Sequence, residues 1–397
     1  MTIANHLAAI FPSKNTPFTL QRRPTPKPGP GELLIAVKSI ALNPADTIMQ
    51  SHGLFIQSYP TVLGFDISGL VIDVGEGVPV PTPSTDGSNG PVFKAGVTRV
   101  AAYAAAVWKG CDPDYGAFQE KCLVPWEHAV PIPDNGEGEE EREKLSWNEA
   151  ASLPVSVQVP LNAWDALGIP RMDTIIESGE TSEQGKQGQR KNALLIWGAS
   201  SSVGTMGVQT ARLLRDDHDS SFAAVYATAG AANHSYIRSL GTDRVFDYKD
   251  SKVVEEIVAA AREDGVVIRH CFLAVGQLAQ CQAVLKAFLA DVHDVTQLDD
   301  QEAKAKIASA PPISADAAVV EGVETIFVQP SMNNEAERLA QFRYWMGTWL
   351  RNALVKKAIR PSPEIKVVGR GLGAIDVGLD ELAQGVSCMK LVVEVAE

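Results

Sequence analysis

The hydrophobic pattern along the chain changes character near its middle. The first part carries short aliphatic and β-branched runs separated by glycine, as in "ELLIAVKSIALN" and "YPTVLGFDISGLVIDVGEGV", which is typical of strands and turns. Later apolar runs alternate with segments whose apolar residues recur at helical spacing. We expect strands at 193–197, 223–228 and 244–246, and helices at 203–214 and 233–240. This alternation predicts a βαβαβ unit of a doubly wound parallel sheet that follows a β-rich domain.

Polar stretches interrupt this pattern. Residues 80–91, 133–144 and 177–192 are rich in turn formers and charge and have no apolar face, so we expect surface loops. The glutamate-rich run at 137–143 is either a docking patch or a solvated loop, and a run of charge favours the loop. Ser146 precedes a segment of helical periodicity and is expected to cap a helix that starts at Trp147.

The sequence "LLIWGASSSVG" joins a buried strand to the start of a helix through glycine and small hydroxyl residues. A helix N-terminus at such a turn directs backbone N–H groups and the positive end of its dipole at a ligand, which suits a pyrophosphate. Gly198 permits the turn, while Gly204 and Gly207 permit close approach of cofactor and sheet. Serines stand where a strict G-x-G-x-x-G motif has its second glycine, so a Gly/Ser turn of another α/β protein stays an alternative.

The next expected strand ends at Thr228, Ala229 and Gly230, where a dinucleotide-binding fold contacts the ribose. An NAD enzyme has Asp or Glu there to bind the 2′-hydroxyl, and this chain has no carboxylate that would repel a 2′-phosphate. The sequence therefore favours NADP(H), although no Arg or Lys stands directly beside Thr228. Tyr248 either lies along the adenosine or packs at the end of a strand.

Composition and charge restrict the class of partner. The 397 residues are 45% hydrophobic and have a formal charge of -13, from 48 acidic and 35 basic residues. This charge disfavours nucleic acid and anionic membranes and favours a small-molecule substrate. No apolar run is long enough to span a membrane and the first residues lack a secretory signal pattern, so we expect a cytoplasmic protein. The five scattered cysteines predict free thiols.

Several motifs, taken in order, resemble the medium-chain dehydrogenase/reductase superfamily, in particular its zinc-less fungal branch of CipB-like oxidoreductases, quinone reductases and trans-acting enoyl reductases. They include "ALNPADTIMQSHGLF", "GAFQEKCLVP", "EAASLPVSVQVPLNAWDAL", "IRSLGTDRVFDYKD" and "GLDELAQGVSCMKLVVEV", and they run through nearly the whole chain. The resemblance implies an α/β fold with a GroES-like β-rich catalytic domain at 1–160. It also implies a Rossmann NADP(H)-binding domain at 161–345 and a return to the catalytic domain at 346–397.

The resemblance implies where the site residues lie. The "NPAD" loop lies beside the nicotinamide in this family, so Asn43, Pro44 and Asp46 are expected in the cleft, while a turn or N-cap role is the alternative for Asp46. Several relatives have a tyrosine acid at a place that Phe55 occupies in this chain, and Tyr59 is the nearest phenol, with plain packing as its alternative. The expected catalytic residues are Asn43, Asp46 and Tyr59. The expected cofactor-binding residues are Pro44, Gly198, Ser201, Ser202, Val203, Gly204, Thr228, Gly230, Asn233, Tyr248, Val275 and Gly276.

One departure from the family concerns the 2′-phosphate. The family has Thr-Ala-Ser, then a basic or polar residue, then Asn in this segment. In this chain Gly230, Ala231 and Ala232 replace the Ser and basic positions, and Asn233 remains. The departure weakens the expected preference for NADPH over NADH.

A second departure concerns zinc. Zinc-dependent relatives place Cys and His ligands in the segments that correspond to "NPADTIM" and "LGFDISG". This chain has Asp46 in the first segment, and Phe65 followed by Asp66 in the second. A phenyl ring cannot bind a metal, and His52 with one carboxylate does not complete a set of three ligands. We therefore expect no metal.

These observations predict the class of reaction. Without a metal to polarise a carbonyl, hydride transfer to an activated C=C bond or a quinone is easier than reduction of a simple ketone. We expect an NADP(H)-dependent reductase of an enone, an enoyl thioester or a quinone. The alternatives are an NADPH-binding sensor or structural protein without turnover, and a trans-acting enoyl reductase that docks a carrier protein of a polyketide synthase. A homodimer stays open, and Trp345 and Trp349 either line a substrate cleft or belong to the core.

Overall fold

The structure is a computed structural model that describes residues 4–81, 90–133, 145–172, 191–289 and 304–395. It divides into two compact units, which we describe separately. Unit 1 holds residues 1–155 and 331–397, and unit 2 holds residues 156–330. Most of the three expected polar loops, including the glutamate-rich run, lies outside the described residues.

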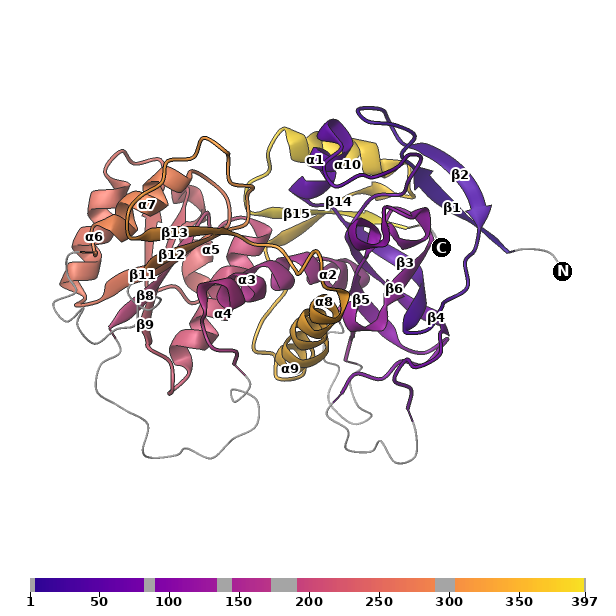
Figure 1. Cartoon of the computed structure of the whole chain (residues 1–397), viewed down its shortest axis with the longest axis horizontal. Coiled ribbons are helices and arrows are strands. Elements are labelled where there is room, and N and C mark those ends of the chain that lie inside the picture. Colours follow the sequence, from indigo (N-terminus) through magenta and orange to yellow (C-terminus); the bar gives the residue numbers. More distant parts are fainter. Residues whose placement is uncertain (1–3, 82–89, 134–144, 173–190, 290–303, 396–397) are drawn as a thin grey trace. The chain divides into compact units, whose positions relative to one another are not determined.

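Unit 2 contains one parallel sheet of six strands (Figure 1). The strands are β8 (Asn192–Trp197), β9 (Phe222–Ala229), β10 (Arg244–Asp247), β11 (Val267–Leu273), β12 (Ala305–Ser309) and β13 (Val323–Phe327). Their order in the sheet is β10-β9-β8-β11-β12-β13, and every neighbouring pair is parallel. Numbered along the chain, this is the 3-2-1-4-5-6 order of a dinucleotide-binding fold. The expected Rossmann sheet is confirmed.

Helices cover both faces of this sheet because alternate side chains of a buried strand point to opposite faces. The helices of unit 2 are α3 (Pro154–Leu167), which begins in unit 1, α4 (Ser202–Asp216), η4 (Ala231–Asn233), α5 (His234–Ser239), α6 (Val253–Glu263) and α7 (Leu278–Lys286). On one face, a Cβ at Gly207 of α4 would lie 2.9 Å from Phe272, whose ring lies 5.7 Å from Trp164 of α3. The glycine therefore sets how closely α4 approaches the sheet.

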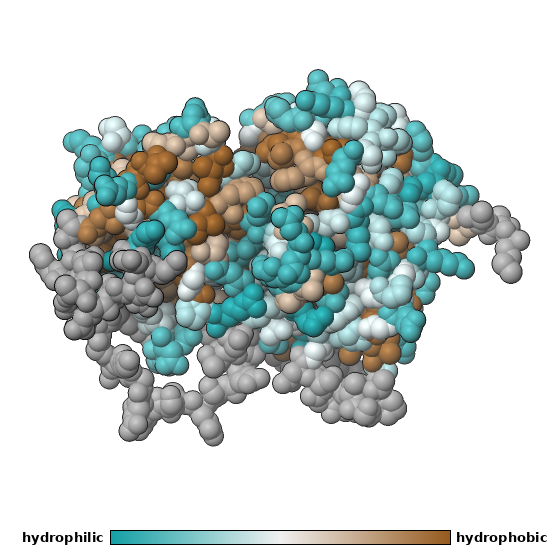
Figure 2. All heavy atoms as spheres, viewed as in Figure 1, coloured by the Kyte–Doolittle hydropathy of each residue, from teal (hydrophilic) through white to brown (hydrophobic). Residues whose placement is uncertain are grey.

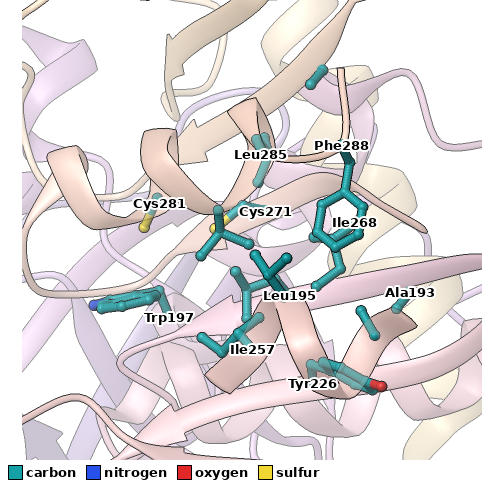
Figure 3. Packing of buried hydrophobic residues seen from close by; sticks show 14 of the residues in the cluster. Ala193, Leu195, Trp197, Tyr226, Ile257, Ile268, Cys271, Cys281, Leu285 and Phe288 are labelled. Atoms are coloured by element: carbon teal, nitrogen blue, oxygen red, sulfur yellow. The ribbon is translucent and has the colours of Figure 1, made fainter. Parts of the chain in front are cut away.

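The other face carries the main apolar core of unit 2 (Figure 3). Leu195 and Trp197 of β8 point to this face and meet Ile257 of α6 and Cys281 of α7, all fully buried or nearly so. Figure 3 shows Leu195 near the centre of the cluster, with Ile257 and Cys271 beside it. Both faces of this sheet therefore carry apolar side chains, as is typical of a parallel sheet that is covered by helices on both sides.

Unit 1 is built around β3 (Glu32–Ala41), which pairs antiparallel with β4 (Asp66–Val74), β6 (Lys121–Pro125) and β15 (Met389–Glu394). The sheet order is β14-β15-β3-β4-β5-β7, with β6 also on β3. The remaining strands are β1 (Asn5–Ile10) and β2 (Thr19–Pro24), which pair with each other, β5 (Arg99–Tyr103), β7 (Ala129–Pro131) and β14 (Glu364–Arg370). The C-terminal strand therefore returns to the N-terminal sheet, with Val392 opposite Ala41.

The helices of unit 1 are short. They are α1 (Pro44–His52), η1 (Ala106–Lys109), η2 (Pro113–Tyr115), η3 (Trp126–His128), α2 (Trp147–Ala151), α8 (Glu335–Phe342), η6 (Arg343–Leu350), α9 (Arg351–Val355) and α10 (Ala374–Ala383). As expected, Ser146 caps α2, because its hydroxyl accepts the N–H of Glu149.

Unit 1 resumes at Ser331, earlier in the chain than the expected residue 346. Phe342 of α8 lies 5.1 Å from the ring of Tyr103 and 5.3 Å from that of Trp345, so the segment packs into the aromatic core of unit 1. Trp345 and Trp349 are buried, which places both in the core.

All five cysteines are free. Within the described residues, no helix is both long enough and apolar enough to cross a membrane.

Gly204 provides a test of the turn before α4. Its Cβ in an alanine variant would lie 2.3 Å from the carbonyl oxygen of Gly198, so the substitution must displace the turn. We expect Gly204→Ala to lose about 1–3 kcal/mol of unfolding free energy, the usual cost of overpacking, measured from the urea unfolding midpoint. Gly90→Ala is the matched control, because its Cβ meets nothing within 4 Å. Equal midpoints for the two variants would contradict this reading.

Candidate functional site

Unit 1 buries a cluster of four polar side chains at one end of β3. Asn43 lies between β3 and α1, Asp46 belongs to the first turn of α1, Asp66 begins β4 and Lys390 belongs to β15. These elements converge because β3 pairs with both β4 and β15, and Ala41 stands opposite Asp66 on one side and Val392 on the other. The four side chains are at most 3% exposed.

The Lys390 ammonium is the centre of this cluster. Its Nζ donates to Oδ1 of Asn43 at 2.6 Å and to Oδ2 of Asp66 at 3.1 Å. The Asn43 amide also donates to Oδ2 of Asp66 at 2.9 Å, and the Val155 N–H donates to Oδ1 of Asp66 at 2.8 Å. Charged groups are rarely buried unless paired, and this network supplies the pairing.

The Asp46 carboxyl group accepts fewer hydrogen bonds than that of Asp66. Its Oδ2 accepts the Asn43 N–H at 2.8 Å, whereas its buried Oδ1 has no hydrogen-bond partner within the part of the chain that the structure describes. Burial raises the pKa of Asp46 to about 8, with a smaller upward effect from Asp66. Burial also raises the pKa of Asp66, against the opposing effect of the Lys390 ammonium. Asp46 therefore keeps its proton through the neutral pH range.

Aromatic side chains adjoin the cluster. Tyr103, at the end of β5, stands opposite Asp66 in the strand register, and its ring lies 5.6 Å from Phe65 and 5.4 Å from Trp108. Burial raises the pKa of the Tyr103 hydroxyl, and negative charge on Asp66, or on Asp46 once it ionises, raises it further. Tyr103 and Phe65 are each 7% exposed. These aromatic rings therefore largely exclude solvent from one side of the two carboxyl groups.

Unit 2 contains the glycine turn, between β8 and α4. Gly198 has a φ of 78°, and its N–H donates to the Thr228 hydroxyl at 3.0 Å. The Ser201 hydroxyl accepts the Gly204 N–H at 3.1 Å and donates to the Gly198 carbonyl at 2.9 Å. These hydrogen bonds brace the turn, and a Cβ at Gly204 would lie 2.3 Å from the Gly198 carbonyl oxygen.

The turn lies where the sheet order reverses, between β8 and β11. A Cβ at Gly198 would lie 2.4 Å from the carbonyl oxygen of Val275, so the loop after β11 touches the loop after β8. Val275 is 50% exposed and Gly276 has a φ of 122°. Ligands of open α/β sheets bind at such a reversal point, beyond the carboxyl ends of the strands. Unit 2 therefore fits a dinucleotide.

A third group of residues follows β9 and β10. Gly230 directly follows β9, and a Cβ there would lie 3.8 Å from the ring of Tyr248, which is 41% exposed. Lys249 places its ammonium 5.9 Å from the centre of that ring. The structure therefore brings together Gly230 and Tyr248, which the sequence singled out, with a lysine that it did not. Asn233 lies close by, at the end of η4.

The structure separates other expected residues. Asn43, Pro44 and Asp46 lie at the N-terminal end of α1, whereas His52 lies at its C-terminal end. The hydroxyl of Tyr59 lies over Gly53, directly after α1, and its ring is 5.6 Å from Phe11. Asp46 and Gly53 are seven residues apart along the chain, or about 10 Å of helix rise. Tyr59 is therefore not part of the Lys390 cluster.

Sequence reasoning missed three residues of these sites: Lys390, Tyr103 and Lys249. A lysine inside the apolar run "MKLVVEV" was a signal for Lys390, because buried lysine requires a partner. Tyr103 and Lys249 gave no comparable signal in the sequence. Tyr103 reaches the cluster through the pairing of β5 with β4, and Lys249 lies near Gly230 only in the folded chain.

The residues at this end of β3 do not fit a zinc ion. Asn43 and Asp66 direct their oxygens at an ammonium, and Phe65 offers no donor atom. Among the described residues, no group of three or more His, Cys, Asp or Glu side chains is placed to hold a metal. The expectation of a metal-free site stays a prediction.

Comparisons with known proteins identify the family. A family model described as the alcohol dehydrogenase GroES-like domain matches residues 29–134. The trans-enoyl reductase tndF of Aspergillus flavipes is 36% identical over 390 residues, which cover 98% of each chain. The trans-enoyl reductase tazE of Aspergillus terreus is 36% identical over 336 residues, which cover 83% of this chain and 94% of that protein.

Solved structures show the same fold. An alcohol dehydrogenase superfamily protein of Novosphingobium aromaticivorans superposes with a TM-score of 0.68 at 21% identity, covering 98% of this chain and 100% of the other. The GroES-like match, the two-unit fold and the full-length relatives agree with one another. The chain therefore belongs to the medium-chain dehydrogenase/reductase superfamily of oxidoreductases, in the fungal branch that contains these trans-enoyl reductases.

Proposed function

We propose that this protein is an NADPH-dependent enoyl reductase that saturates the C=C bond of an enoyl thioester presented by a separate synthase. The observation that carries the proposal is the buried Lys390 ammonium, held by Asn43 and Asp66 in the segments where zinc-dependent relatives have metal ligands. The likeness to trans-enoyl reductases over nearly the full chain supports the same class of reaction.

In this proposal, residues of unit 2 would bind the cofactor and residues of unit 1 would stabilise the anion that forms on the substrate. When bound, reduced nicotinamide supplies a hydride to the carbon β to the thioester carbonyl. In unit 2, the backbone N–H groups at the start of α4 and the positive end of its dipole would hold the pyrophosphate. In unit 1, the Lys390 charge favours an anion that develops nearby. An enone or enoyl acceptor gives a delocalised anion, which needs less stabilisation than the alkoxide from a simple ketone.

Asp46 would hold a proton for this reaction. Its carboxyl group is fully buried and its pKa is raised to about 8 by burial, so it is neutral at the pH of the cell interior. Two carboxyl groups whose surroundings differ take different roles: Asp66 pairs with Lys390, whereas Asp46 keeps a proton and a free oxygen. We propose Asn43 and Asp46 as residues of the active site, and Tyr59 as a packing residue.

Lys249 supports NADPH as the cofactor. Gly230, Tyr248 and Lys249 meet beyond the ends of β9 and β10, where the adenosine ribose of a dinucleotide lies. Lys249 offers the positive charge for a 2′-phosphate that the sequence beside Thr228 lacks. Thr228 itself is buried, with its hydroxyl bound to the Gly198 N–H, so it braces the turn.

The reaction is tested with a simple substrate. Purified protein should oxidise NADPH in the presence of crotonyl-pantetheine and form the saturated butyryl thioester, detected by mass spectrometry. Secondary alcohols with NADP⁺ serve as the contrasting assay, because alkoxide chemistry calls for stronger polarisation. Rapid oxidation of those alcohols together with inert enoyl thioesters would refute the proposal. Tight NADPH binding without transfer to any acceptor would instead favour the sensor.

Lys249→Glu tests the cofactor assignment. The change replaces an attractive charge with a repulsive one near the 2′-phosphate, so we expect the KM for NADPH to rise tenfold or more, within the usual range of about 1–3 kcal/mol for coupled close groups. The KM for NADH should change less than twofold. Lys252→Glu is the matched control, since Lys252 is also exposed and lies at the start of α6. A parallel change in both coenzymes would contradict the assignment.

Asp46→Asn tests the protonated carboxyl. Between the ordinary pKa of 3.8 and the folded value of about 8, the folded state keeps a proton that the unfolded state loses. Stability should therefore fall as pH rises from 5 to 8, by up to about 1.4 kcal/mol per pH unit from this one group. Asp46→Asn should remove that contribution, measured by urea unfolding at each pH.

Asp380→Asn serves as the control for this experiment, because Asp380 is an exposed carboxylate on α10 of the same unit. It should leave the pH dependence of the wild type unchanged. The same slope in the wild type and in Asp46→Asn would mean that Asp46 is ionised in the folded protein.

A further inference from the structure

One segment of unit 1 has a charge opposite to that of the whole chain. Between Glu337 and Glu364 the sequence contains no acidic residue. The same stretch contains the basic residues Arg338, Arg343, Arg351, Lys356, Lys357 and Arg360. In a chain with a formal charge of -13, such a local reversal marks a surface that attracts acidic partners. We name residues 343–360 the basic segment.

Several basic side chains of the basic segment are exposed, whereas its two tryptophans are buried. Trp345 and Trp349 of η6 are at most 2% exposed, whereas Lys356, Lys357 and Arg360 after α9 are exposed. The Arg343 side chain is 56% exposed and pairs with Glu127 of η3 at 3.2 Å. Figure 2 shows hydrophilic side chains predominating over the region of α8 and α9 that Figure 1 labels.

An exposed apolar residue lies among these charges. Val355, the last residue of α9, is 61% exposed and directly precedes Lys356 and Lys357. A large apolar side chain surrounded by basic groups is a common composition of protein docking surfaces, where the charges orient the partner and the apolar contact is buried. Ala353, rather than Val355, is the buried residue of α9.

The backbone at Lys357 gives an independent observation. The N–H of Lys357 donates to the Leu354 carbonyl at 3.2 Å, and that of Ala358 donates to the Ala353 carbonyl at 2.9 Å. These are the two hydrogen bonds of a Schellman motif, in which the residue at the Lys357 position is usually glycine. Lys357 has a φ of 53°, a conformation that is unfavourable for lysine. A basic side chain therefore stands at a position where backbone geometry favours glycine.

We propose that the basic segment docks the acidic carrier domain that brings the enoyl thioester to this enzyme. The proposal rests on the proposed function, because a reductase that acts on a separate synthase must bind the domain to which the acyl chain is attached. Lys356, Lys357 and Arg360 contact acidic side chains of the carrier, and Val355 supplies the apolar contact. The segment thus contributes to recognition of the carrier and leaves the reaction itself to the buried cluster.

The test compares substrates that differ only in what holds the crotonyl group: pantetheine, coenzyme A, or a free-standing acidic acyl carrier protein. The variant Lys356→Glu/Lys357→Glu/Arg360→Glu should lower kcat/KM for the carrier-bound substrate at least tenfold and leave that for crotonyl-pantetheine within twofold. The matched control is Arg22→Glu/Lys27→Glu/Lys94→Glu, which makes the same change of charge at exposed basic residues elsewhere on unit 1. It should affect no substrate by more than twofold.

Binding is measured separately by calorimetry with the same carrier protein, charged with a non-hydrolysable crotonyl amide. The wild type should bind it, more weakly as salt rises, and the triple variant should not. Lys357→Gly provides a second variant that cannot fail by misfolding, since glycine suits its φ. It should weaken carrier binding and leave the unfolding midpoint unchanged or higher.

Several outcomes would overturn the proposal. Equal losses in the basic-segment variant and the control variant would show a general charge effect. An equal loss for crotonyl-coenzyme A would mean that the segment binds the phosphates of a small ligand. A change of oligomeric state in the variant would identify a second copy of this chain as the partner. Inert crotonyl-pantetheine would refute the proposed function, while the binding measurement would still decide on docking.

Discussion

The packing of unit 1 depends on one buried ammonium, that of Lys390. It binds Asn43 and Asp66 and so connects the start of α1, the start of β4 and the C-terminal strand β15. Removing one partner of such a buried pair typically costs about 3–5 kcal/mol, because the other charge remains without compensation. The return of the last strand to the first sheet is therefore required by charge as well as by strand pairing.

The position of the Lys390 ammonium also gives the carboxyl groups of Asp66 and Asp46 different surroundings. Asp66 receives the ammonium, the Asn43 amide and a backbone N–H, so its oxygens are satisfied. Asp46 receives one backbone N–H and is otherwise enclosed, so the neutral acid is its stable form. Burial raises the pKa of both aspartates, but only Asp66 has the Lys390 ammonium as a hydrogen-bond donor to oppose that effect.

Unit 2 depends on close backbone contact rather than on charge. Gly198, Gly204 and Gly207 each lie where a Cβ would overlap a neighbouring atom, so the turn, the start of α4 and the sheet approach one another closely. The hydroxyls of Thr228 and Ser201 then fix the turn. This explains how serines can stand in this turn: the Ser201 hydroxyl accepts the N–H of Gly204 at the helix start, and the remaining glycines are those at close contacts.

The sequence by itself determined the fold class, the order of the two units and the glycine turn, because each follows from local periodicity, capping and turn chemistry. It also singled out Asn43, Asp46, Gly230 and Tyr248 through short motifs. It did not single out Lys390, Tyr103 or Lys249. These residues come from strands and loops distant in the chain, and their roles arise from pairing of β15 and β5 with the central strands and from the meeting of loops after β9 and β10. Only tertiary structure decided which charges are buried together, since burial and pairing depend on neighbours that local pattern does not specify.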